Sequence, residues 1–148
     1  MTPKDRYDTS ALTEDQYEPG SDGKVLKNLL GITSRDAMGK AETSALWVAE
    51  ERLLGEVEQK QAFTAKDLCY MHRLWLGSIY PWAGTYRQVN LAKDGFSFAM
   101  AQTIPTLMEE FERDQLQRHT PCLLGEHGAI SMALAEVHVE LMLIHPFR

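Results

Sequence analysis

Apolar residues recur at every third or fourth position along most of this 148-residue chain, the spacing that gathers them on one face of an α-helix. Residues that end helices, mainly glycine and proline, separate the apolar segments. The spacing changes only between residues 85 and 99, where apolar and polar residues alternate as they do in a β-strand. The chain is therefore predicted to be mainly α-helical, with one small β-hairpin.

Local signals define where the predicted helices begin and end. Residues 33–36, with the sequence Thr-Ser-Arg-Asp, form a capping-box-like start, and Thr64 and Asp67 have the spacing of a second capping box. Pro105 suits the first turn of a helix, where its missing N–H would have no partner. The expected helices are a short one at 24–31 and longer ones at 33–58, 64–79, 105–119 and 129–144.

The length and the charge balance limit the class of protein. A chain of this size folds as one domain, which we assign to residues 24–148. The polar residues 1–23, interrupted by proline and glycine, are expected to form an extended arm. Asp and Glu number 21 and Lys and Arg number 15, so the net charge is −6, and no basic run is present. The sequence therefore predicts no nucleic-acid partner.

No segment of the sequence predicts secretion or a membrane partner. The first thirty residues lack the apolar core of a signal peptide, and the chain carries no long uninterrupted apolar run. Cys69 and Cys122 lack the spacing of a zinc site or a disulfide framework and are expected to be buried thiols. A cytoplasmic protein is the expectation.

The end of the last predicted helix holds the residue of greatest chemical interest. Pro146 cannot continue a helix and disfavours helical geometry in the residue before it, so the helix should stop near His145. An imidazole at that place can face a cleft and act as a general base. On spacing alone, the stronger interpretation is a histidine that caps the helix and is favoured by its dipole.

Two motifs resemble those of one protein family. Residues 141–148, Leu-Met-Leu-Ile-His-Pro-Phe-Arg, resemble the opening of the signature of the Fic (Fic/Doc-type) family, H-P-F-x-D/E-G-N-G-R-x-x-R. Residues 80–87, Tyr-Pro-Trp-Ala-Gly-Thr-Tyr-Arg, and the hairpin after them resemble the family's substrate-facing flap. The likeness covers nearly the whole chain, and the two motifs together are specific. The resemblance implies a Fic-type helical domain whose small hairpin is the flap.

The resemblance implies a bacterial, toxin-like protein adenylyltransferase, which moves AMP from ATP to a Ser, Thr or Tyr hydroxyl of a target protein. His145 would then remove the hydroxyl proton, and Pro146 and Phe147 would anchor the loop. The hairpin, roughly residues 89–98, would pair with an extended segment of the target. The flap positions that this implies for docking are Val89, Asn90, Leu91, Gly95 and Phe96. The alternative interpretation is a surface ribbon that packs Phe96 and Phe98 into the core.

The rest of the family signature is absent after Arg148. The missing residues are the acidic ligand of Mg²⁺, the Gly-Asn-Gly backbone that cradles phosphates, and both clamping arginines. No metal ligand is therefore expected within this chain. We expect a fragment whose C-terminal part is missing, and which is inactive as it stands because phosphate transfer depends on positioning and charge neutralisation.

Other functions and controls stay open at this stage. The chain could be a non-catalytic helical module that binds a peptide along the hairpin edge, or a Fic member that transfers another phosphate-containing group. An antitoxin chain or an inhibitory helix could restrain it, and a homo-oligomer is left open. The nearest match to an inhibitory motif, Ser10 to Asp15 around Glu14, is interpreted as a coincidence, and His72 as packing at the core boundary beside Trp75.

Overall fold

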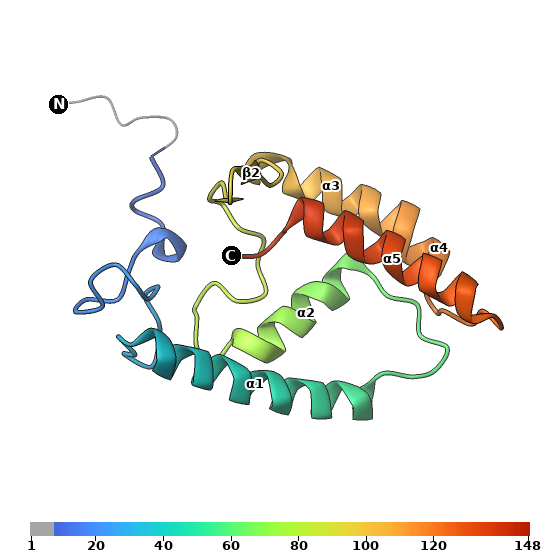
Figure 1. Ribbon diagram of the computed structural model, residues 1–148, viewed down its shortest axis with the longest axis horizontal. Helices are drawn as coiled ribbons and strands as arrows, with labels where there is room; N and C mark the ends of the chain where they lie inside the picture. Colours follow the sequence, from blue (N-terminus) through green and yellow to red (C-terminus); the bar gives the residue numbers. More distant parts are fainter. Residues whose placement is uncertain (1–7) are drawn as a thin grey trace.

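The computed structural model describes residues 8–148, so residues 1–7 of the predicted arm lie outside it. The structure is mainly helical with a small two-stranded sheet, which confirms the predicted fold class (Figure 1). Its α-helices are α1 (Arg35–Glu56), α2 (Ala65–Leu76), α3 (Ile104–Phe111), α4 (Gln117–His119) and α5 (His127–Ile144). The shorter elements are η1 (Thr13–Asp15), β1 (Ala92–Lys93), β2 (Phe96–Ser97), η2 (Ala101–Thr103) and the π-helical η3 (Glu112–Leu116).

The predicted capping box forms at α2, whereas α1 begins near the predicted place but is capped by Ser34 alone, without a reciprocal acid. The Ser34 hydroxyl accepts a hydrogen bond from the Ala37 N–H, at 3.4 Å. At α2 the Asp67 N–H donates to the Thr64 hydroxyl at 3.2 Å, and the Thr64 N–H donates to the Asp67 carboxylate at 2.8 Å. These side chains satisfy N–H groups that have no partner within the helix, which fixes where each helix begins.

The helix predicted at residues 24–31 is wrong. The chain there forms turns, with an isolated antiparallel bridge between Tyr17 and Leu26. The Asn28 side chain explains the difference: its Oδ1 accepts from the Leu30 and Ile32 N–H groups, and its Nδ2 donates to the Leu26 and Ile32 carbonyls. An asparagine that offers the backbone such partners replaces the hydrogen bonds that a helix would make.

The hairpin is shorter than the alternating pattern predicts. Only Ala92 pairs with Ser97 and Lys93 with Phe96, although alternation extends over residues 85–99. The two turn residues, Asp94 and Gly95, both have positive φ, at 51° and 81°, as two-residue hairpin turns require. Residues 85–91 form no strand because their polar groups bond elsewhere, as described below.

Two groups of buried residues form the core. The first lies where α1 packs on α2 and on the turn that follows α2. The second lies where the helical run α3–η3–α4 packs on α5. Figure 1 shows α5 alongside α3, with α2 between this pair and α1. The C-terminal end of α5 therefore lies close to the hairpin and to the turn after α2.

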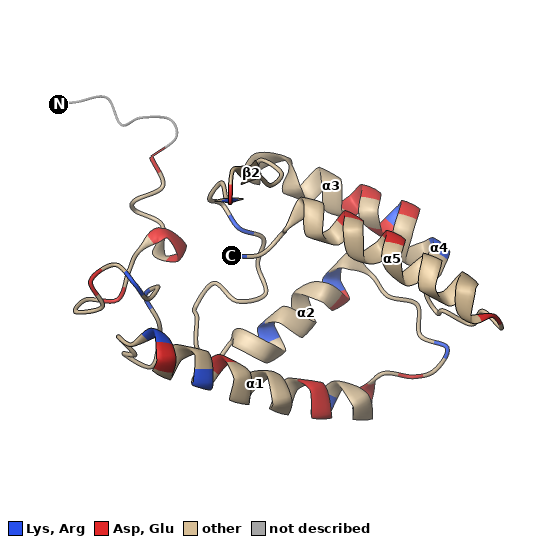
Figure 2. Cartoon of the chain, in the orientation of Figure 1, with Lys and Arg blue, Asp and Glu red and all other residues tan. Residues whose placement is uncertain are grey.

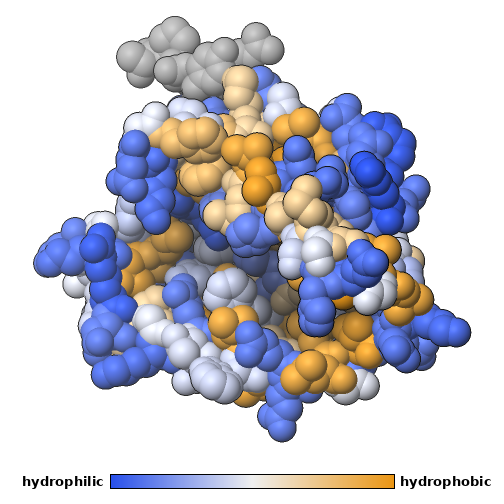
Figure 3. All heavy atoms as spheres, turned by 45° about the vertical axis from the view of Figure 1, so that its right-hand side comes forward, coloured by the Kyte–Doolittle hydropathy of each residue, from blue (hydrophilic) through white to orange (hydrophobic). Residues whose placement is uncertain are grey.

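Exposed apolar side chains occur on both long outer helices. They include Trp47, Val48 and Leu54 of α1, and Met132, Leu134, Val139, Met142 and Leu143 of α5. Figure 3 shows apolar residues interspersed with hydrophilic ones on one face of the molecule. By length and composition alone α5 is long and apolar enough to cross a membrane, which the search for uninterrupted apolar runs did not predict. A core helix of a soluble protein meets the same criterion, so this single helix carries little weight.

Candidate functional site

His145 lies at the C-terminal end of α5, as the sequence predicts. Its backbone is left-handed, with φ 48° and ψ 65°, and its N–H donates to the Leu141 carbonyl at 2.9 Å. A residue with a Cβ rarely adopts this conformation, and where it does the surrounding structure has to hold it there. The left-handed residue ends the helix and turns residues 146–148 back towards the turn that follows α2.

The imidazole of His145 is partly buried between the flap and a cavity. Its ring stacks on that of Phe98, which follows β2, with centroids 4.4 Å apart and planes 22° apart. On another side it lines a cavity of about 370 Å³ together with residues of α2, of the turn after α2 and of the C-terminal segment. Burial first, and the charge of Arg87 second, lower the pKa of His145 below 6.5. Both effects favour the neutral ring, which is the form that can accept a proton.

Arg87 is the most completely engaged side chain next to His145. It is 2% exposed, and its guanidinium donates to the carbonyls of Val89 at 2.7 Å, Ala99 at 2.5 Å, Ile144 at 3.1 Å and His145 at 2.7 Å. The buried Glu14 carboxylate offsets part of the Arg87 charge, and a buried guanidinium also needs acceptors for its N–H groups. Here the acceptors are the last carbonyls of α5 and the carbonyls at both ends of the flap.

Pro146 and Phe147 lie against the segment that precedes the flap. The buried Pro146 accepts a hydrogen bond from the Arg87 N–H through its carbonyl, at 2.9 Å. The Phe147 ring stacks on that of His72 in α2, with centroids 4.2 Å apart and planes 11° apart. His72 in turn accepts the Gly84 N–H at Nδ1, at 2.9 Å, and burial lowers its pKa to about 4. A neutral histidine thus joins α2, the turn after it and Phe147.

The five flap residues implied by the resemblance occupy different environments. Val89 is 3% exposed, so its side chain packs in the protein interior and is not available to a target. The Asn90 side chain accepts the Ala101 N–H at 2.8 Å, and the Leu91 carbonyl accepts the Phe98 N–H at 3.0 Å. Gly95 lies in the exposed turn, and Phe96 is 49% exposed beside Phe98. Asn90, Gly95 and Phe96 are therefore the implied flap residues that present a surface to solvent.

Neither flap phenylalanine packs into the two core groups. Phe96 contacts Phe98 edge to face, with centroids 5.4 Å apart, and Phe98 covers the His145 ring. The interpretation of residues 85–99 as a ribbon anchored in the core by these two rings is therefore wrong. The hairpin is held instead from its base, by Arg87 and by Val89.

The arm contributes a residue that sequence reasoning dismissed. Glu14, in η1, is 6% exposed, and its carboxylate accepts the Gln88 N–H at 2.9 Å. Its carbonyl accepts a hydrogen bond from Nε of Arg148, at 2.9 Å. Residues 8–23 are thus not uniformly extended, and Glu14 contacts both the base of the flap and the segment after His145.

Arg87, His72, Phe98 and Glu14 are site residues that sequence reasoning missed. A signal for Arg87 was present: in an alternating segment it lies on the same face as Val89 and Leu91, and a charged residue on an apolar face needs partners. No comparable signal marks His72 or Glu14, because their partners are backbone groups 12 and 74 positions away.

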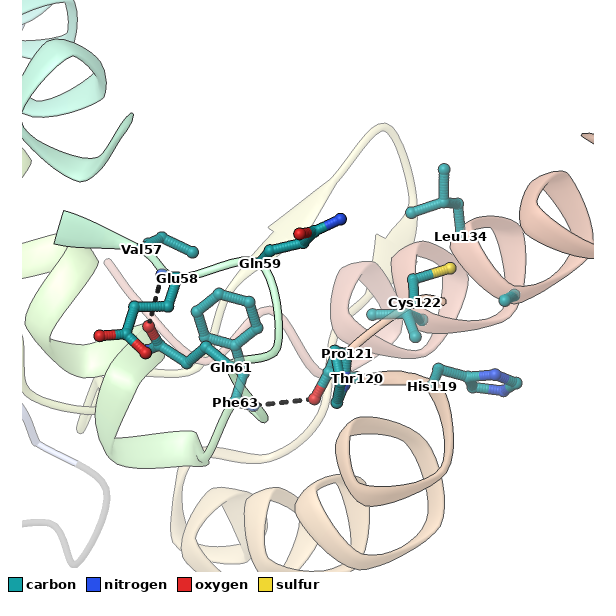
Figure 4. A pocket seen from close by; sticks show the side chains of 12 residues that line it. Val57, Glu58, Gln59, Gln61, Phe63, His119, Thr120, Pro121, Cys122 and Leu134 are labelled. Carbon is teal, nitrogen blue, oxygen red and sulfur yellow. Dashed lines mark hydrogen bonds between the residues drawn. The ribbon is translucent and has the colours of Figure 1, made fainter. Parts of the chain in front are cut away.

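A second cavity lies along α5 on the side away from the hairpin. It measures about 360 Å³ and is enclosed by the loop between α1 and α2, by residues 119–122 and by α5 (Figure 4). The Phe63 N–H donates to the Thr120 hydroxyl across one edge, at 2.8 Å. Cys122, which was predicted to be buried, is exposed on this cavity, and Cys69 is half-buried. The signature residues 145–148 are not among those that line it.

Within residues 8–148 no group of three or more His, Cys, Asp or Glu side chains could hold a metal ion. We assign no step of the chemistry to a metal. Figure 2 shows that acidic residues recur along α1 and along the α3–α4 run, whereas Lys and Arg do not gather on one element.

Comparison with known proteins identifies relatives of this chain. It is 26% identical over 140 residues to the protein adenylyltransferase VbhT of Bartonella schoenbuchensis, a match that covers 92% of this chain and 28% of VbhT. The N-terminal FIC domain of Bep8 from Bartonella sp. 1-1C superposes with a TM-score of 0.70 at 21% identity, over 84% of this chain and 63% of that one. BepC from Bartonella tribocorum, solved with bound AMPPNP, gives a TM-score of 0.66 at 20% identity, over 84% and 66%.

The solved relatives agree with the fold. This chain spans just over a quarter of VbhT and about two thirds of the solved Bartonella domains. Residues 62–148, more than half of the chain, match the Fic/DOC family. They include α2, the flap and the His-Pro-Phe segment, and the match confirms the resemblance drawn from the sequence. The protein therefore belongs to the Fic/DOC family.

Proposed function

We propose that this chain is part of a protein adenylyltransferase, which transfers AMP from ATP to a Ser, Thr or Tyr hydroxyl of a target protein. The observation that carries the proposal is the place of the His145 imidazole, at the end of α5 and stacked on Phe98 of the flap. The naming of VbhT as a protein adenylyltransferase and the AMPPNP bound to BepC support this choice of reaction.

In the proposed reaction His145 is the general base. Its ring nitrogen takes the proton of the target hydroxyl while the hydroxyl oxygen forms a bond to the α-phosphorus of ATP. The bond from that phosphorus to the bridging oxygen breaks, and pyrophosphate leaves. A hydroxyl is a weak nucleophile without a positioned base, so the lowered pKa of His145 suits the step. Phe98 covers one face of the ring, so the ring nitrogens at its edge are the atoms left to accept the proton.

The flap would bind the target segment that carries the hydroxyl. The hairpin has only two strands, so each strand has an outer edge on which an extended segment could pair. Phe96 stands exposed beside that edge, where it can contact the target's side chains. The described residues hold no metal cluster, and the phosphate-binding residues of the family signature belong after Arg148. We therefore propose that the 148 residues alone do not transfer AMP.

The test uses the protein expressed from its complete gene. It is incubated with ATP labelled at the α-phosphate or at the γ-phosphate, and label on protein is measured. We expect label only from the α-phosphate, and none with His145→Ala. His138→Ala is the matched control, because His138 is an exposed histidine of the same helix, two turns earlier, and its variant should transfer at the normal rate.

Two outcomes would contradict the proposal. Transfer that persists in His145→Ala would remove His145 as the base. Label that arrives from the γ-phosphate, or only from other nucleotides, would show that the protein transfers another phosphate-containing group. Tight binding of an extended peptide by the hairpin without any transfer would favour the second candidate function, a peptide-binding module, which the free strand edges and the exposed Phe96 support.

A further inference from the structure

We propose that Arg87 is a positioning residue that fixes the flap and the backbone of His145 as one rigid unit. A hydroxyl presented by the flap would then meet the imidazole in a set geometry. The inference rests on the proposed transfer reaction, but it makes a separate statement about the structure. Arg87 does not touch the reacting atoms; it acts through the carbonyl groups that it holds.

The first argument is the set of segments that one guanidinium joins. The carbonyls of Val89 and Ala99 lie just before β1 and just after β2, so they mark the two ends of the flap. The carbonyls of Ile144 and His145 are the last of α5 and the first of the segment after it. An arginine presents its donors in a fixed planar fork, so four simultaneous bonds set the distance and the angle between these segments.

The second argument is that the two strands themselves do little to orient the hairpin. Residues 92–97 are exposed throughout, and each strand contains only two residues. A hairpin of that size is not stable by itself in water. Two further backbone bonds join its base to the C-terminal segment: the Arg87 N–H donates to the Pro146 carbonyl at 2.9 Å, and the Ala99 N–H to the Leu143 carbonyl at 3.4 Å. The guanidinium adds bonds to the carbonyls of Ala99, Ile144 and His145.

The third argument is the backbone of His145. Its left-handed conformation is unfavourable for a residue with a Cβ, so neighbouring interactions must hold it. The Nε of Arg87 donates to the His145 carbonyl at 2.7 Å, and the preceding carbonyl receives a bond from the same guanidinium. Loss of these bonds would let His145 relax towards the extended geometry that a residue before proline favours, and carry its ring away from Phe98.

Two variants at position 87 separate positioning from folding. Arg87→Lys keeps the charge and a long side chain, but one ammonium group cannot reach four carbonyls spread around a planar fork. Arg87→Met removes all four hydrogen bonds of the guanidinium and leaves the backbone bond to Pro146 in place. The matched control is Arg113→Met, since the Arg113 guanidinium is exposed and bonds only to the neighbouring Asp114 carboxylate among the hydrogen bonds described.

The structural test is amide hydrogen exchange of the chain without nucleotide. In both Arg87 variants we expect faster exchange at residues 88–99 and 145–148, with unchanged exchange in α1 and α2. The control should match the wild type throughout. Unchanged exchange of the flap and of residues 145–148 in Arg87→Lys would overturn the proposal. Unfolding of Arg87→Lys as well as Arg87→Met would also overturn it, because Arg87 would then stabilise the fold in general.

The functional test uses the protein from its complete gene. For Arg87→Lys we expect kcat to fall about 100-fold, as for a reacting group displaced by about 1 Å, with little change in the KM for ATP. An unchanged kcat in a wild-type protein that transfers AMP would overturn the inference. If the wild-type protein transfers nothing, the proposed function fails, whereas the exchange experiment still decides whether Arg87 holds the flap to His145.

Discussion

At the scale of single residues, the site depends on side chains that bond to backbone groups distant in sequence. Arg87 binds carbonyls at both ends of the flap and at the end of α5, and His72 joins α2 to Gly84 and Phe147. Both side chains are buried, so their charge states are set by the interior rather than by water. His145 shares this environment in part, and its chemistry follows from it.

His72 should make the stability of the fold depend on pH. Its pKa is about 4 in the folded protein, against an ordinary value of 6.5, because burial disfavours the charged ring. In the unfolded chain the His72 ring therefore takes up a proton as the pH falls below 6.5, whereas in the folded protein it does so only near pH 4. The contribution of His72 to the free energy of unfolding is complete above pH 6.5 and is lost as the pH falls from there towards 4. The expected loss is about 2 kcal/mol between pH 7.5 and pH 5.

Urea unfolding at several pH values measures this effect. Carboxylates also titrate at the acidic end, so the comparison is with His72→Gln, which lacks the titrating ring. The wild type should lose more stability than the variant between pH 7.5 and pH 5. Equal losses in the two proteins would show that His72 takes up its proton normally in the folded state.

His145 should titrate below 6.5 in the folded protein. Burial is the larger cause, and the nearby Arg87 guanidinium is the second. The measurement is an NMR titration of the ring protons, in which the exposed His138 provides a comparison on the same helix. A pKa of His145 raised well above its ordinary value would mean that the ring is mostly charged at neutral pH, and a charged ring cannot accept a proton.

At the scale of elements, helix boundaries were predictable wherever the signal is local. The capping box of Thr64 and Asp67, and the end of α5 before Pro146, depend on residues within four positions of each other. The predicted helix at 24–31 failed because Asn28 offers its own hydrogen bonds to the backbone, which apolar spacing does not reveal. Alternation over 85–99 predicted a longer hairpin than the structure has. Arg87 bonds to carbonyls of residues 144 and 145, so the segment around it is not part of a strand.

The cap of α2 gives a test at this scale. Thr64→Ala removes the acceptor for the Asp67 N–H and should lower the free energy of unfolding by about 1 kcal/mol. The matched control is Thr43→Ala at an exposed position within α1, where alanine favours the helix slightly. Thermal or urea unfolding of both variants is the measurement. A Thr64→Ala protein as stable as the control would show that the capping box contributes nothing.

At the scale of the whole molecule, the site is assembled from segments that the sequence keeps far apart. Glu14 of the arm bonds both to the base of the flap and to Arg148. His72 of α2 stacks on the neighbouring Phe147. Sequence reasoning found the motif and the helix that ends at His145, because both are continuous in the chain. It could not find the residues that hold this segment in place, because their partners are specified only by the fold.

The reaction itself is the central claim, and intact mass spectrometry tests it most directly. The protein from its complete gene is weighed before and after incubation with ATP, Mg²⁺ and a target protein, alongside His145→Ala. We predict that the target, or the protein itself, gains the mass of one adenylyl group in the wild-type reaction and gains nothing with the variant. No gain in the wild-type reaction, or an equal gain with His145→Ala, would contradict the account.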